Sequence, residues 1–124
     1  MIDREQHPGS APPPQIVLDV WADLVCPWCY IGRARVRAAV TAWERPHEVL
    51  VRHRAYELDP GMPRGQRRPI LAHLAAKLGG DEDSSREMTD RVTAVAAADG
   101  VVLDFGSAVA ANSFDGHRLV ALAR

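Results

Sequence analysis

The chain has two cysteines, and both lie in the segment Cys26-Pro27-Trp28-Cys29, directly behind the apolar run of residues 16–21. This order predicts a strand that leads into a helix, with Pro27 in the first helical position, where its missing N–H costs nothing. Cys26 then caps the helix, and its sulfur faces the unpaired amides of the first turn. Because these amides and the helix dipole favour a thiolate, we expect Cys26 to be largely ionised at neutral pH and to act as a nucleophile.

Cys29 follows one helical turn later, within reach of a mixed disulfide on Cys26, so it can expel the partner's thiol from such an adduct. We therefore assign Cys26 the attacking role and Cys29 the resolving role in a thiol-disulfide exchange. Trp28 stands between them and is expected at the surface, where it and Pro27 would offer a flat apolar platform for a bound substrate. The expected partners are protein or small-molecule thiols and disulfides.

Two other interpretations of the cysteine pair fit less well. A structural zinc ion takes four ligands, and the chain has neither a third cysteine nor a histidine pair at ligand spacing, so we expect no metal site. A permanent disulfide across so short a loop would remove little entropy from the unfolded chain. Asp23 either helps to move a proton at Cys29 or fixes the turn into the helix by accepting backbone amides, and the second role is favoured.

The composition is that of an ordinary soluble enzyme domain, with 47% hydrophobic residues, 25% charged residues and a formal net charge of -1. It predicts no nucleic-acid partner and no membrane association. Residues 1–15 are polar, contain three consecutive prolines and lack the apolar core of a signal peptide, so we expect a disordered arm. Without an export signal, the chain is expected in the cytoplasm, where a disulfide is a transient catalytic state.

Residues 16–60 show the pattern of a strand, a helix and a second strand. The near-continuous apolar run at residues 16–21 predicts a strand covered on both faces. The helix that starts at the cysteine motif is expected to end near Glu44, before Pro46. Hydrophobic and polar residues then alternate over residues 48–58, which predicts a second strand parallel to the first.

Residues 61–124 change to the period of helices and are expected to form a helical domain. A short helix is predicted over residues 70–78, where Gly79 stops it. Ser84 opens a capping-box signature for a second helix, and Gly100 closes that helix.

The end of the chain predicts a loop at residues 104–111 and a last helix, for which Asn112 and Ser113 can supply the cap. The apolar pattern of this helix still continues at Arg124. Two strands rarely make a stable sheet, so we expect the domain to be incomplete. Its exposed sheet edge would then let the chain self-associate or form a homodimer.

Three stretches in order along the chain resemble the DsbA-like thioredoxin-fold oxidoreductases, in particular their FrnE-like branch. The first is an extended segment that ends in Cys-Pro-Trp-Cys-Tyr-Ile-Gly at residues 26–32. The second is residues 54–60, with Tyr56 where phenylalanine is usual. The third, residues 112–119, is similar to an Asn-Thr-x-x-Ala-His-Arg-Leu stretch, with serine and glycine replacing threonine and alanine.

The resemblance implies an α/β fold: a thioredoxin-like β-α-β unit at residues 16–60 that carries the cysteine pair, and a helical insertion domain at residues 61–124. Members of the family are longer, and their remaining part supplies a cis-proline loop and two further strands. The C-terminal strands would thus be missing here. The implied activity is protein disulfide oxidoreduction without a cofactor.

Two alternatives stay open. Kappa-class glutathione transferases and 2-hydroxychromene-2-carboxylate isomerases share this architecture but carry serine where Cys26 stands. Their chemistry would make glutathione a co-substrate, held by Trp28, Asn112 and the loop at residues 58–60. The other alternative is a non-catalytic fragment that only binds thiols.

Separately, His117 and Arg118 fall on the same side of the last helix as Phe114. There they either line the cleft between the two domains and bind substrate or lie on an exposed helix face.

Overall fold

A computed structural model describes residues 15–123, so the arm expected at residues 1–15 lies outside the described residues except for Gln15. Its elements are β1 Ile16–Ala22, α1 Pro27–Ala42, the short 3-10 helix η1 Pro46–Glu48, β2 Val49–Ala55, β3 Arg67–Pro69, α2 Ile70–Leu78, α3 Glu82–Ala98, β4 Val109–Ala111 and α4 Phe114–Leu122. None of the described helices is long and apolar enough to cross a membrane.

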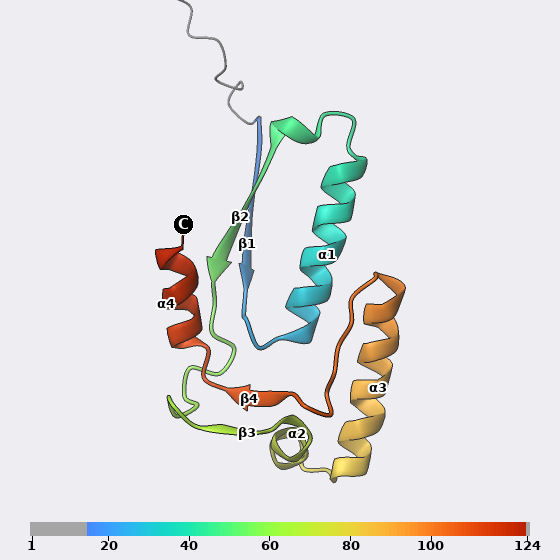
Figure 1. The fold of residues 1–124 in the computed structure, drawn as a ribbon, viewed down its shortest axis with the longest axis vertical. Coiled ribbons are helices and arrows are strands. Elements are labelled where there is room, and N and C mark those ends of the chain that lie inside the picture. The colour runs from blue at the N-terminus through green and yellow to red at the C-terminus, as the bar shows by residue number, and fades with distance from the viewer. Residues whose placement is uncertain (1–14, 124) are drawn as a thin grey trace, which may run out of the picture.

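The strands β1 and β2 run parallel, in a register from Ile16 opposite Val49 to Ala22 opposite Ala55. In Figure 1 this pair lies between α1 and α4, and the β3–β4 ribbon crosses beyond the C-terminal ends of the two strands. The predicted β-α-β arrangement is confirmed. It matters for function because the C-terminal end of β1 leads directly into the cysteine motif.

Helix α1 starts as the sequence predicts, with Cys26 as its extended N-cap residue and Pro27 in its first turn. It ends at Ala42, slightly before the expected boundary, because Trp43 adopts an extended backbone. Pro46 then starts η1, which leads into β2.

The buried core lies between α1 and α3 and leaves much of the sheet open. Ile31 of α1 packs with Val92 and Ala96 of α3 and with Val101 behind it. Partly buried side chains surround this cluster: Ala34, Val95, Leu103 and Phe105.

The prediction that the first strand is covered on both faces is wrong for the described chain. Ile16, Val17 and Leu18 are 38%, 43% and 39% exposed. Hydrophobicity indicates what a strand could bury, but burial needs a partner surface, and residues 15–123 do not place one closely over this end of β1.

Helices α2 and α3 have caps that the sequence predicts only in part. Gly79 ends α2 with φ 70°, a left-handed conformation that glycine adopts without strain. Helix α3 starts earlier than the Ser84 signature predicts: Asp81 is the N-cap, and its carboxylate accepts the Ser84 N–H at 2.8 Å. Aspartate is as good a cap residue as serine, so Asp81 can start the helix three residues before Ser84.

The region after β2 also contains a small sheet that the sequence did not predict. Strands β3 and β4 pair antiparallel, with Arg67 opposite Ala111 and Pro69 opposite Val109. The loop expected at residues 104–111 therefore ends in a strand, and the largely helical region includes a two-stranded ribbon. This ribbon holds α2 and the start of α4 near the end of the β-α-β unit (Figure 1).

Candidate active site

The cysteine pair occupies the first turn of α1, as the sequence predicts. The Tyr30 N–H donates to the Cys26 carbonyl at 3.2 Å, which closes this turn and places Cys29 one turn beyond Cys26. Both thiols are free and half-buried. The pair thus has the geometry in which an adduct on Cys26 stands within reach of the second thiol.

The protonation state of Cys26 differs from the prediction. Burial raises the pKa of the Cys26 thiol, and the neighbouring Cys29 thiol raises it further. The amides of Cys29 and Trp28 lower it but do not outweigh burial, so the pKa lies above its ordinary value of 9.0. The prediction that Cys26 is largely ionised at neutral pH is therefore wrong for this structure.

A cavity of about 390 Å³ reaches Cys29 from the C-terminal ends of β1 and β2. Asp23 and His117 line the same cavity, as do the basic side chains of Arg33, His53 and Arg54. A larger hollow of about 700 Å³ runs along the Arg37 side of α1 and includes neither cysteine. The smaller cavity is the candidate site for thiol chemistry, because it is lined by the Cys29 thiol and by ionisable side chains.

Asp23 fixes the turn between β1 and α1, which confirms the favoured interpretation. Its side chain is buried and accepts the N–H groups of Leu24 and Leu58, both at 2.7 Å. Burial opposes its ionisation, but these amides, the Ser113 hydroxyl and His117 outweigh burial and lower the pKa of Asp23. The residue is therefore a buried carboxylate that joins three segments of the chain.

His117 approaches Asp23 from α4. Its Nε2 lies 3.2 Å from Asp23 Oδ1 and 3.1 Å from the Tyr56 carbonyl oxygen. A carbonyl and a carboxylate only accept hydrogen bonds, so Nε2 carries a hydrogen. The sequence pointed to both residues separately, but it gave no sign that side chains 94 positions apart would pair.

Trp28 lies at the surface, as the sequence predicts. Trp28 is 51% exposed, and Leu24, Val25 and Tyr30 are also exposed. Pro27 lies beside Trp28 in the first turn of α1. Their substrate-binding role stays a prediction, and these exposed side chains are the sequence neighbours of the two cysteines.

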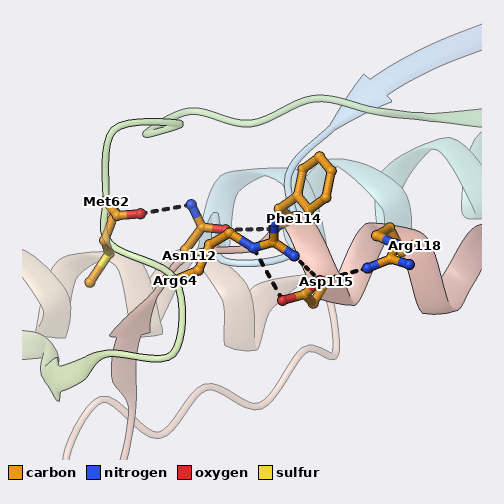
Figure 2. A network of polar contacts seen from close by, with 6 residues as sticks. All are labelled: Met62, Arg64, Asn112, Phe114, Asp115 and Arg118. Carbon is orange, nitrogen blue, oxygen red and sulfur yellow. Dashed lines mark hydrogen bonds and ion pairs between the residues drawn. The ribbon is translucent and has the colours of Figure 1, made fainter.

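Asn112 lies outside the cavity and organises the start of α4. Its amide Nδ2 donates to the Met62 carbonyl at 2.8 Å, and its Oδ1 accepts the Phe114 N–H at 2.9 Å (Figure 2). Asn112 therefore supplies the expected helix cap, whereas the Ser113 side chain makes no capping bond.

Arg64 joins the same network from the segment before β3. It lies 4.5 Å from the centre of the Phe114 ring and pairs with Asp115, which also bonds Arg118 (Figure 2). These contacts tie the chain after β2 to α4, the helix that carries His117. Within the described chain, no three histidine, cysteine or acidic side chains gather where they could hold a metal ion.

Comparison with known proteins agrees with this geometry. Residues 17–124 match the DSBA-like thioredoxin domain family. The fold is similar to the crystal structure of a probable DsbA oxidoreductase from Streptomyces coelicolor, with 37% sequence identity and a TM-score of 0.82. The match covers 88% of this chain and 47% of that one, so the chain spans about half the length of this relative.

No curated protein matches the chain. The family match nevertheless covers the β-α-β unit, the cysteine pair and the helical region together, and the structural match covers nearly the same part of the chain. The chain therefore belongs to the DSBA-like thioredoxin domain family.

Proposed function

We propose that the chain acts in thiol-disulfide exchange as a DsbA-type oxidoreductase of the FrnE-like branch, with Cys26 as the attacking and Cys29 as the resolving thiol. The observation that carries this proposal is the position of the pair: Cys26 caps α1, and Cys29 stands one turn later beside a cavity. The family membership supports thiol chemistry of this general kind.

The exchange proceeds in two displacements. The Cys26 thiolate attacks one sulfur of a substrate disulfide, the substrate S–S bond breaks, and one substrate sulfur leaves as a thiolate. The Cys29 thiolate then attacks Cys26 and expels the second substrate sulfur. The protein is left with a Cys26–Cys29 disulfide, which a dithiol or glutathione reduces again.

The surface around the motif supports a broad choice of substrates. Trp28, Leu24 and Tyr30 are exposed within three residues of a cysteine, and exposed apolar and aromatic side chains there suit an extended polypeptide that presents a disulfide. We place the reaction in the cytoplasm and assign it no cofactor besides the thiol donor.

Disulfide reductase assays on the single-cysteine variants test the proposal. With a dithiol donor, Cys26→Ser should abolish turnover, whereas Cys29→Ser should accumulate mixed disulfides that mass spectrometry detects on Cys26. Trp28→Ala should raise KM for a peptide disulfide. Trp43→Ala, which removes an exposed tryptophan just beyond the other end of α1, is the matched control.

The effect of the cysteine substitutions and the choice of thiol donor together distinguish the exchange from the two alternative functions. Unchanged turnover in both cysteine variants would contradict the exchange. Turnover that depends strictly on glutathione and survives Cys29→Ser would instead favour a glutathione-dependent transferase or isomerase. Adduct formation without any turnover would indicate a thiol-binding fragment.

A further inference from the structure

The proposed exchange does not say which group accepts the proton of Cys29. When Cys29 resolves the mixed disulfide it must lose its proton, because the thiolate is the attacking species. The cavity beside Cys29 is lined by the hydrogen-bonded pair of Asp23 and His117, neither of which has a part in the exchange as described.

We propose that His117, held in place by Asp23, accepts the proton that Cys29 releases when it attacks the mixed disulfide on Cys26. This inference deepens the proposed function and rests on it. His117 is then the proton acceptor, and Asp23 is a positioning residue that acts through the imidazole.

The hydrogen bonds of His117 leave one ring nitrogen available as a base. Nε2 carries a hydrogen because it faces the Asp23 carboxylate and the Tyr56 carbonyl. In the neutral ring Nδ1 then has a free lone pair, and no described residue bonds to it. The imidazole is held at one nitrogen and can accept a proton at the other.

The surroundings of the ring suit a proton acceptor. The His117 side chain is 11% exposed and that of Asp23 is 1% exposed, so a carboxylate shielded from water faces the ring. A positive charge on the ring is therefore compensated at 3.2 Å. Cys29 and His117 both line this cavity, which has room for several water molecules, each of about 30 Å³ in the liquid.

The atoms and electrons of the step balance. The S–H bond of Cys29 breaks, and its proton passes through the cavity water to Nδ1 of His117. The sulfur electron pair forms the Cys26–Cys29 bond, and the bond between Cys26 and the substrate sulfur breaks. The substrate leaves as a thiolate with that electron pair, and His117 later returns its proton to solvent. The oxidant is the substrate disulfide itself.

Other ionisable side chains also line this cavity, and each must be considered as an alternative proton acceptor. Arg33 and Tyr30 line it from α1, and His53 and Arg54 line it from β2. The arginines carry charge without accepting protons near neutral pH. His53 is a second imidazole and is therefore included as a variant.

A coloured aromatic disulfide separates the two displacements in stopped-flow kinetics. Attack by Cys26 releases one chromophore, and resolution by Cys29 releases the second. General base catalysis contributes about 10²–10⁴-fold, so His117→Gln, which keeps an N–H donor, should slow the second release by at least about tenfold. The first release should stay within about twofold, and the defect should shrink in alkaline solution, where thiols ionise unaided.

Controls distinguish a chemical from a structural effect. His73→Gln on α2, outside the cavity, should leave both phases unchanged. Free imidazole added to His117→Ala should restore the second phase, a rescue that a merely structural role would not give. Circular dichroism shows whether His117→Gln folds. If it does not, the role of His117 is judged from the imidazole rescue of His117→Ala, measured below the unfolding temperature of that variant.

The outcomes are separable. If the unaltered chain shows no second release, the proposed exchange itself fails. If both releases occur and His117→Gln leaves the second unchanged, slows both equally or is mimicked by His53→Gln, the exchange stands and the role of His117 is overturned. Failure of imidazole to restore the second phase overturns it as well.

Discussion

Two opposing effects determine the pKa of the Cys26 thiol. Its place at the start of α1 brings the amides of Trp28 and Cys29 towards the sulfur, and these favour the charged form. Burial disfavours it and prevails. The helix start therefore limits the cost of ionising Cys26, but in this chain it does not make the thiol acidic.

The first prediction concerns the pH dependence of Cys26. Because its pKa is raised above 9.0, the thiolate fraction should keep growing with pH through neutrality, and the rate of alkylation should rise without a plateau below pH 9.0. Since the Cys29 thiol contributes to the raised pKa, Cys29→Ala should move the profile to lower pH. Timed reaction with iodoacetamide, followed by mass spectrometry, measures both. A plateau near pH 7 would contradict the prediction.

The second prediction concerns Asp23 and stability. Asp23→Ala leaves the part-buried amides of Leu24 and Leu58 without an acceptor, at about 1–3 kcal/mol each, so it should lower the free energy of unfolding by about 2–6 kcal/mol. Urea unfolding measures this loss. Asp23→Asn keeps one acceptor oxygen and should cost less.

The same carboxyl gives a pH signature. Its folded pKa lies below the ordinary value of 3.8, so its stabilisation is complete above that pH and is lost as the pH falls through the folded pKa. The acid limb of the stability profile should therefore be shallower in Asp23→Asn than in the unaltered chain. Parallel acid limbs would contradict the assigned ionisation.

At the scale of elements, α4 is placed by Asn112, two residues before its start, and by the connector before β3. Asn112 caps the helix and also binds the Met62 carbonyl, so one side chain fixes both the helix start and the segment that precedes the ribbon (Figure 2). The ion pair of Arg64 with Asp115 is exposed and adds little, because water screens it.

The third prediction compares the contribution of the Asn112 hydrogen bonds to stability with that of the exposed Arg64–Asp115 ion pair. Asn112→Ala should cost about 1–2 kcal/mol in urea unfolding, through loss of the helix cap and of the Met62 bond. Asn112→Asp keeps the acceptor for Phe114 but loses the donor to Met62, and it should fall between. Arg64→Ala, as the control in the same network, should cost less than about 1 kcal/mol. A larger loss for Arg64→Ala would show that the ion pair, and not the cap, holds α4.

The elements also show where sequence patterns sufficed. The apolar run at residues 16–21 predicts β1 to within one residue, and the helical pattern at residues 70–78 predicts α2 with its observed bounds. The helix from Pro27 is also predicted, with a small error at its C-terminal end. The β3–β4 ribbon was missed because three-residue strands, one of them Arg67-Arg68-Pro69, carry no period to detect.

The candidate site was predictable to the same extent. Local spacing placed Cys26, Pro27 and Cys29 on the first turn of α1, since all three depend on one helix start. The pairing of Asp23 with His117 and the raised pKa of Cys26 depend on packing between distant segments. No local pattern records such contacts.

At the scale of the whole molecule, burial is uneven. The packed cluster joins α1, α3 and the segment after α3, whereas both strands of the parallel sheet are edge strands in the described chain. Val17 and Leu50 pair in register on one face and are 43% and 42% exposed. Unpaired backbone edges beside exposed apolar side chains favour association.

The fourth prediction is that this sheet mediates self-association of the chain in isolation. Sedimentation velocity should show the average mass rising with concentration, because pairing of edge strands buries apolar surface and satisfies backbone groups. Val17→Lys places a charge at the sheet and should shift the chain towards monomer. Val102→Lys, at a position 90% exposed in the loop after α3, is the matched control and should leave association unchanged. A monomer at every concentration would contradict the prediction, and equal effects of both lysines would show that net charge, and not the sheet, governs association.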